Sequence, residues 1–203
     1  LAARAAKADW DVREHGLAGG HGQQLRVYAS AETHTWIQKA ADLTGLGTAA
    51  IRWIPTDSNL RMDVAELRRQ IDSDITAGDV PFLVVGTAGS VSTGAVDALP
   101  GIAALCREKA LWFHVDGAYG GFAAAVPEAP GDLRGLAEAD SVACDPHKWL
   151  YAPLEAGCAL ARGWEVKLDA EQPGSGPCEQ SPPNPHTRAQ AREPRVEPGR
   201  VLS

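Results

Sequence analysis

An alternation of short apolar segments with helical segments, between residues 25 and 162, constrains the fold of this chain more than any other feature. The apolar segments are rich in β-branched or aromatic side chains and end at polar or turn-forming residues, which is typical of strands. Six segments have this character: LRVYAS (25–30), AAIRWI (49–54), PFLVVG (81–86), LWFHVD (111–116), SVAC (141–144) and GCALAR (157–162).

Helical patterns separate several of these segments. Asp63 and Glu66 are a predicted capping pair at the start of a helix over 63–75. One face of that helix carries apolar residues at helical spacing: Val64, Leu67, Ile71 and Ile75. Further helices are predicted over 34–45 and 99–110, and residues 1–12 have the pattern of the latter part of a helix.

This order of elements predicts an α/β fold in which helices flank a mostly parallel sheet. The segment FLVVG is apolar on both faces, as a strand covered by helices on both sides should be. The composition changes after residue 162, and half of the 14 prolines lie in 163–203. We therefore expect one domain over 1–162, followed by a Pro/Gly-rich tail that is irregular, disordered or a translation artefact.

Charge and composition exclude several classes of partner. The net charge is −7 and no dense Lys/Arg block occurs, so neither nucleic acid nor an anionic membrane is an expected partner. No apolar run approaches the roughly 20 residues that span a bilayer. Four cysteines occur without a CxxC pair, which favours reduced thiols and a cytoplasmic protein: Cys106, Cys144, Cys158 and Cys178. Cys144 and Cys158 lie in apolar strands and are predicted core residues.

Polar residues follow four of the predicted strands. They are His34, Thr87, Asp116 and Lys148. Ligands of parallel α/β sheets bind outside the carboxyl ends of the strands, so these four side chains are expected to converge on one small ligand.

Pyridoxal 5′-phosphate would use this set of groups. It needs a lysine for a Schiff base and a carboxylate beside its pyridine nitrogen. Lys148 would hold the aldehyde, Asp116 would pair with the ring nitrogen, and His34 would stack on the ring. His147 would reach the phosphate or the substrate carboxylate.

The motif HVDGAYGG (114–121), followed by DPHKWL (145–150), resembles the pyridoxal-dependent group II decarboxylases. These include aromatic-L-amino-acid, histidine and glutamate decarboxylases. The resemblance extends from about Tyr28 to Arg162. It implies the large domain of the aspartate-aminotransferase (type I) fold, here incomplete, and a lyase that decarboxylates an L-amino acid, with aromatic substrates as the first expectation.

The resemblance also implies site residues. Lys148 and His34 would be catalytic, with His34 also orienting protonation after CO2 leaves. The implied cofactor-binding residues are Lys148, Asp116, His34, Ala118, His147, Asp145, Thr87 and Ser90. Some members carry threonine where this chain has Val91, which is therefore left out. No metal is expected, because a site made from His114, Asp116 and His147 would leave Lys148 without a role.

Two features of the sequence depart from the family pattern. The phosphate-binding turn of the family would precede Leu1, and the family's C-terminal part does not follow Arg162. We therefore expect a fragment that is inactive alone, and a homodimer for the full-length protein.

Alternatives remain open. Another type I enzyme, such as an aminotransferase, aldolase or lyase, would use the same lysine and aspartate. A second alternative is a non-catalytic remnant that lacks the phosphate site. Singly, Lys148 could be a surface lysine, Asp116 a helix cap and His34 the start of a helix. Trp149 is expected to pack rather than to touch substrate.

Overall fold

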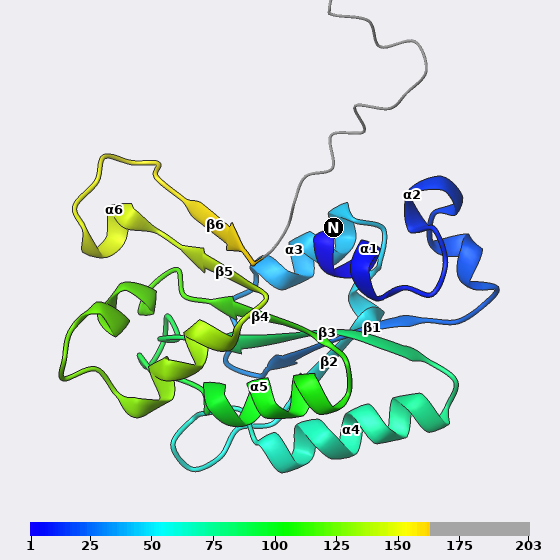
Figure 1. Ribbon diagram of the computed structural model, residues 1–203, viewed down its shortest axis with the longest axis horizontal. Helices are drawn as coiled ribbons and strands as arrows, with labels where there is room; N and C mark the ends of the chain where they lie inside the picture. Colours follow the sequence, from blue (N-terminus) through cyan, green and yellow to red (C-terminus); the bar gives the residue numbers. More distant parts are fainter. Residues whose placement is uncertain (163–203) are drawn as a thin grey trace, which may run out of the picture. The chain divides into compact units, whose positions relative to one another are not determined.

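The computed structural model describes residues 1–162 of the 203-residue chain. Its centre is a sheet with the strand order β2-β1-β3-β4-β5-β6 (Figure 1). The first five strands along the chain pair in parallel, and β6 is antiparallel to β5. The strands are β1 (Leu25–Ser30), β2 (Ile51–Ile54), β3 (Val80–Thr87), β4 (Trp112–Asp116), β5 (Ser141–Cys144) and β6 (Cys158–Ala161). The expected α/β class and all six expected strands are confirmed.

Helices cover both faces of the sheet. In Figure 1, α4 and α5 lie below it, and α1 and α3 lie above it. The helices are α1 (Ala2–Lys7), α2 (Val12–His15), α3 (Trp36–Leu43), α4 (Val64–Thr76), α5 (Leu99–Glu108) and α6 (Pro146–Trp149). Four 3-10 segments complete the described part: Leu17–Gly20, Thr48–Ala50, Gly121–Ala125 and Gly131–Glu138.

The prediction of a single helix at the start of the chain is wrong, because two short helices form there. Helix α1 ends at Lys7, and the Asp11 carboxylate accepts hydrogen bonds from the backbone N–H groups of Arg13 and Glu14. A cap of this kind begins a new helix rather than continuing an old one. Asp11 therefore starts α2 inside the segment that the sequence pattern assigns to one helix.

The predicted start of helix α4, at Asp63, is confirmed. The Asp63 carboxylate accepts hydrogen bonds from the N–H groups of Ala65 and Glu66, which have no partners within the helix. Leu67 and Ile71 are fully buried, whereas Ile75 is about half exposed. The apolar face therefore leaves the core in the last turn.

Two apolar clusters hold the layers together. One joins α4 and α5 to the sheet and includes Tyr28, Leu67 and Phe113. The other joins α1 and α3 to the opposite face and includes Val27 and Ile37. Consecutive residues of β1 thus enter different clusters, as the alternation of side chains along a strand requires.

The strand order reverses between β1 and β3. The chain passes from β1 outward to β2 and then returns to the other side of β1 to form β3. Such a reversal opens a crevice at the carboxyl ends of the two strands, which is the usual ligand position in this class of sheet. The buried Asp97 carboxylate fixes the end of β3 by accepting hydrogen bonds from Thr87 N (2.8 Å) and Met62 N (2.6 Å).

Two further expectations concern other parts of the chain. Cys144 is buried as predicted, but the core position predicted for Cys158 is wrong, because this residue is exposed on β6. The predicted tail, 163–203, lies outside the described residues. Within residues 1–162, no helix is both long enough and apolar enough to cross a membrane.

Candidate functional site

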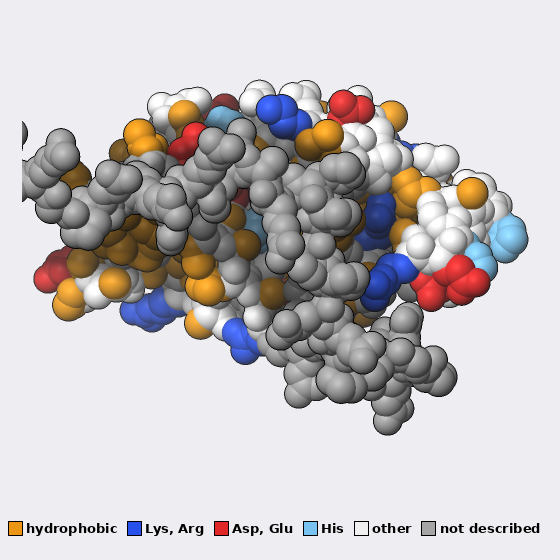
Figure 2. Space-filling model, turned by 90° about the horizontal axis from the view of Figure 1, so that it is seen from above, with side chains coloured by type: hydrophobic (Ala, Val, Ile, Leu, Met, Phe, Trp, Pro, Cys, Tyr) orange, Lys and Arg blue, Asp and Glu red, His pale blue; other side chains and the backbone are white. Residues whose placement is uncertain are grey.

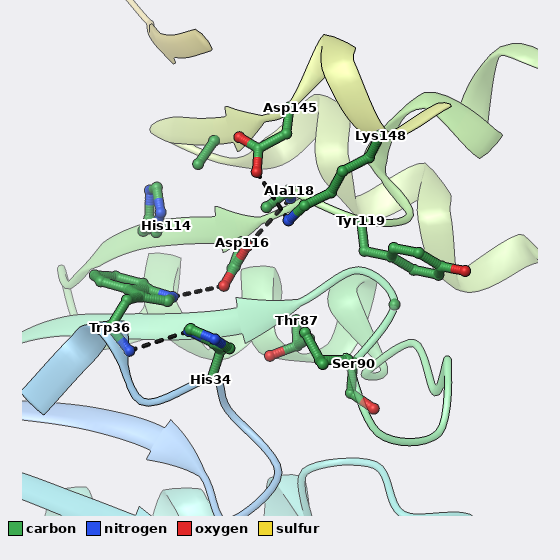
Figure 3. Close-up of a pocket in the computed structure, with 13 residues that line it drawn as sticks. His34, Trp36, Thr87, Ser90, His114, Asp116, Ala118, Tyr119, Asp145 and Lys148 are labelled. Carbon is green, nitrogen blue, oxygen red and sulfur yellow. Dashed lines mark hydrogen bonds and ion pairs between the residues drawn. The ribbon is translucent and has the colours of Figure 1, made fainter. Parts of the chain in front are cut away.

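A cavity of about 350 Å³ opens at the carboxyl ends of β1, β3, β4 and β5 (Figure 3). Seven of the eight predicted site residues line it: His34, Thr87, Ser90, Asp116, Ala118, Asp145 and Lys148. The rest of its wall comes from Trp36, Gly89, Val91, His114, Tyr119 and Ala143. Residues from four separate segments therefore meet at one site.

Asp116 ends β4 and supplies a buried carboxylate to this cavity. Its Oδ2 accepts a hydrogen bond of 2.6 Å from the Trp36 indole Nε1–H, and its Oδ1 accepts one of 3.1 Å from the Ala118 N–H. A carboxylate has about four acceptor positions, so both oxygens can accept further donors. The group is therefore oriented by two neutral donors and still able to bind a cationic N–H.

Lys148 reaches the cavity from α6. The turn begins at Asp145 and Pro146, and proline is favoured at a first helical position. The ammonium Nζ lies 2.8 Å from Asp145 Oδ2, and about a third of the Lys148 side chain is exposed. Figure 3 shows this side chain pointing toward Ala118 and Asp116. An amine and a buried carboxylate thus face the same space.

His34 follows β1 and lines the cavity. Its Nδ1 accepts a hydrogen bond of 3.2 Å from the Trp36 backbone N–H at the start of α3. The alternative in which His34 begins the helix is thus partly correct, but the same ring also faces the cavity. Its Nε2 is not used by this bond, so that nitrogen can contact a ligand.

Thr87 is the last residue of β3, and Ser90 lies on the loop that follows it. The Thr87 hydroxyl is 3.5 Å from that of Thr33, and the Ser90 hydroxyl is 2.6 Å from that of Thr93. This loop packs directly on the loop after β4, since a Cβ added at Gly120 would lie 2.5 Å from the Ala88 carbonyl oxygen. Glycine is required at that position because the two backbones touch.

His147 is the predicted site residue that the structure does not bring to the cavity wall. Its Nδ1 is 2.8 Å from the Ala156 carbonyl oxygen, and its Nε2 is 4.0 Å from Asp145 Oδ2. The bond to Ala156 links the lysine turn to the segment before β6. Its role near a phosphate stays a prediction.

Sequence reasoning missed three aromatic residues of the wall: Trp36, His114 and Tyr119. His114 Nδ1 is 2.8 Å from Ser141 Oγ, and the Trp36 ring packs edge-on against His114 at 6.0 Å. Burial lowers the pKa of His114, which keeps the imidazole neutral. The only early signal for His114 was its position two residues before Asp116, on the same side of the strand.

Trp149 packs against a neighbouring side chain, as expected, and is not part of the cavity wall. Its side chain is 47% exposed and packs edge-on against Tyr119 at 5.9 Å between ring centroids.

In the part of the chain that the structure describes, no three His, Cys, Asp or Glu residues are grouped to hold a metal ion.

Comparison with known families gives one match over most of the chain. Residues 1–171 match the pyridoxal-dependent decarboxylase conserved domain. An aromatic-L-amino-acid decarboxylase of Bacillus atrophaeus is 41% identical over 136 residues, which cover 67% of this chain and 28% of the relative. A mouse cysteine sulfinic acid decarboxylase is 42% identical over 138 residues, covering 68% of this chain and 28% of the relative.

Solved structures give the same result. The apo form of mouse CSAD has a TM-score of 0.71 and 40% identity, covering 75% of this chain and 32% of its own. Oryza sativa TDC with PLP and tryptamine has a TM-score of 0.70 and 37% identity, covering 79% and 34%. The chain spans less than a third of the length of the curated relatives described above.

Proposed function

Because the chain belongs to the pyridoxal-dependent decarboxylase family, we propose that its cavity is the cofactor site of an enzyme that converts an L-amino acid to an amine and CO2. The cofactor of this family is pyridoxal 5′-phosphate. When bound, it supplies an aldehyde that condenses with amines and a ring that accepts electrons from the substrate's α-carbon. The observation that carries the proposal is the presence of Lys148 and Asp116 in the wall of one cavity.

The residues fit the ring of this cofactor. The Lys148 amine and the buried Asp116 carboxylate face the same cavity (Figure 3). Ala118 and Ala143, also in its wall, have small side chains and leave room for a flat group between the amine and the carboxylate. Asp116 keeps acceptor positions free despite its two hydrogen bonds. A protonated pyridine nitrogen is the kind of donor that such a carboxylate prefers.

Asp116 would hold a proton on the ring nitrogen. A buried carboxylate stabilises a nearby cation more strongly than an exposed one, because little water screens the pair. Trp36 and Ala118 fix the carboxylate in advance, so it need not reorient when charge develops.

Lys148 would supply the amine that binds the cofactor aldehyde. Its ion pair with Asp145 holds the amine at the cavity before the cofactor arrives. His34 would present a flat ring to the cofactor, and its Nε2 would move a proton to the substrate after CO2 leaves.

The wall of the cavity favours an aromatic substrate. Within residues 1–162, it carries no arginine and only Lys148 as a lysine, so an acidic side chain has no further cation to bind. Trp36, Val91 and Tyr119 offer apolar surface instead. The relatives described above act on different classes of amino acid, since they include an aromatic-L-amino-acid decarboxylase and a cysteine sulfinic acid decarboxylase.

Product analysis of the full-length protein tests the proposal. With pyridoxal phosphate and L-tryptophan, the expected products are CO2 and tryptamine in equal amounts, with a lower rate on L-glutamate. Lys148→Ala should abolish the reaction, and the matched control Lys39→Ala, on exposed α3 surface, should not. A keto acid in place of the amine would identify a different reaction.

Two expectations about the whole protein stay predictions. Light scattering of the full-length protein should give the mass of a homodimer. Fractionation of the source cells should place it in the cytoplasm.

A further inference from the structure

Cys144 and Cys158 lie directly opposite each other in the antiparallel pair of β5 and β6. Both are free thiols. Directly opposite residues point to the same face of a sheet. Ala143 lines the cavity, so its neighbour Cys144 points to the opposite face of the sheet. There its Sγ packs against Gly121, at 3.1 Å from the position that a Cβ on this glycine would take.

The register brings the two cysteines within disulfide range. Asp140 and Arg162 lie opposite each other, one position beyond the Ser141–Ala161 pair, and Arg162 N donates a hydrogen bond of 2.8 Å to Asp140 O. Hydrogen-bonded pairs alternate along an antiparallel ladder, so Cys144 and Cys158 also form such a pair, with Cα atoms about 5.5 Å apart. Disulfides span roughly 4.4–6.8 Å between Cα atoms.

The two thiols differ in access. Cys144 is 8% exposed, and burial together with the neighbouring Cys158 raises its pKa. Cys158 is exposed and can meet a reagent from solution. The exposed thiol would therefore react first, and the buried thiol would resolve the product.

We propose that Cys144 and Cys158 form a reversible redox modification site that exchanges with low-molecular-weight disulfides such as glutathione disulfide. The Cys158 thiolate attacks the small disulfide, forms a mixed disulfide and releases one small thiol. Cys144 then loses its proton and attacks the Cys158 sulfur, which releases the second small thiol. Two protein thiols are oxidised to one disulfide, and one small disulfide is reduced to two thiols.

This disulfide would join the two ends of the loop that carries Lys148. The loop contains the 13 residues 145–157, which begin at the Asp145 partner of that lysine. Strand β6 is already paired with β5 over four residues, so the disulfide needs no change of strand register. Cys158 is exposed, and exposed disulfides are more easily reduced than buried ones, which makes the modification reversible. The effect on Lys148 rests on the proposed function, whereas the thiol chemistry does not.

Thiol mapping of the 203-residue chain tests the proposal, and the experiment needs no cofactor. The protein is incubated with glutathione disulfide, denatured, alkylated and digested. Two of the four cysteines should escape alkylation, a peptide linking Cys144 to Cys158 should appear, and dithiothreitol should remove it. Amide exchange within 146–157 should slow at least about two-fold in the oxidised form. Unchanged exchange would overturn the effect on the loop.

Variants separate the two steps. Cys144→Ser and Cys144→Ala should retain a glutathione adduct on Cys158, and Cys158→Ser should form neither adduct nor link. The matched control is Cys106→Ser, which should behave as wild type, because burial raises the pKa of Cys106 to about 12 and keeps it unreactive. A wild-type reaction that stops at the Cys158 adduct, or that links Cys158 to Cys178, would overturn the proposal.

Discussion

The two groups that define the candidate site come from regions with very different packing. Asp116 ends β4, in the middle of the sheet, where the central side chains of β1, β3 and β4 are almost completely buried under helices on the two faces. Lys148 belongs to the β5–α6–β6 hairpin, in which every residue of β6 is exposed. Figure 2 shows hydrophobic side chains gathered over the end of the molecule that carries this hairpin, where the exposed residues include Trp149, Leu150, Tyr151 and Leu154.

The proposed function gives these two regions different chemical tasks. A carboxylate that stabilises a cation works best when it is fixed before the charge develops. A lysine that must bind a cofactor, leave it and return needs freedom of movement, which a thinly packed element provides. We therefore expect changes in the packed region to affect stability, and changes in the hairpin to affect chemistry.

The largest expected effect is that of Lys148→Ala. Decarboxylation by the full-length enzyme should fall at least about 1,000-fold, since the cavity wall holds no second lysine among residues 1–162. Because the side chain is partly exposed, the free energy of unfolding should change by no more than about 0.5 kcal/mol. Activity assays and urea unfolding measure the two quantities, and a large loss of stability would contradict the division between the regions.

Core truncation should show the opposite pattern. Ile71→Ala removes a fully buried side chain from α4 and should lower the free energy of unfolding by about 2–5 kcal/mol. The matched hairpin change is Leu154→Ala, at an 80% exposed position, which should cost less than about 0.5 kcal/mol. Equal losses in urea unfolding would show that the hairpin is packed as tightly as the core.

An ion network should make the packed region sensitive to acid. Burial alone would raise the pKa of Asp74, but hydrogen bonds from Arg52, Tyr28 and Gln70 lower it below its ordinary value. Its contribution to stability is therefore complete above the unfolded-state pKa of about 3.9, and is lost as the pH falls through the folded-state pKa.

Asp74→Asn tests this network. This variant should lower the free energy of unfolding by about 2 kcal/mol at pH 7. The loss is smaller than for a fully buried pair, because Arg52 is partly exposed and still has Asp79 as an ion-pair partner at 3.4 Å. Unfolding curves measured from pH 7 to pH 2 should lose part of their pH dependence in this variant. An unchanged dependence would show that other carboxylates control acid unfolding.

The smallest expected effect concerns the contact that fixes Asp116. Trp36→Phe removes the indole donor and should lower activity about 10-fold, which is the lower limit for the loss of one hydrogen bond to a charged group. The absorbance of bound cofactor should also change its pH dependence, which a purely structural role would leave alone. The control Trp53→Phe, at a 41% exposed position on β2, should alter neither quantity.

The sequence contained most of the fold because strands and helices follow local periodicity. The Asp63 cap of α4 is a contact between neighbouring residues and could be predicted. The Trp36–Asp116 bond joins residues 80 positions apart, and no local pattern signals it. The exposure of Cys158 depends on β6 lying at the sheet edge, and the direction of His147 depends on the Ala156 carbonyl. Both are set by tertiary placement.

The most direct test of the central claim is reductive trapping of the cofactor. The full-length protein is incubated with pyridoxal phosphate, treated with borohydride, digested and mapped by mass spectrometry. The account predicts a pyridoxyl group on Lys148, and none in Lys148→Ala. A label on another lysine, such as Lys39 or Lys109, or no label at all, would contradict it.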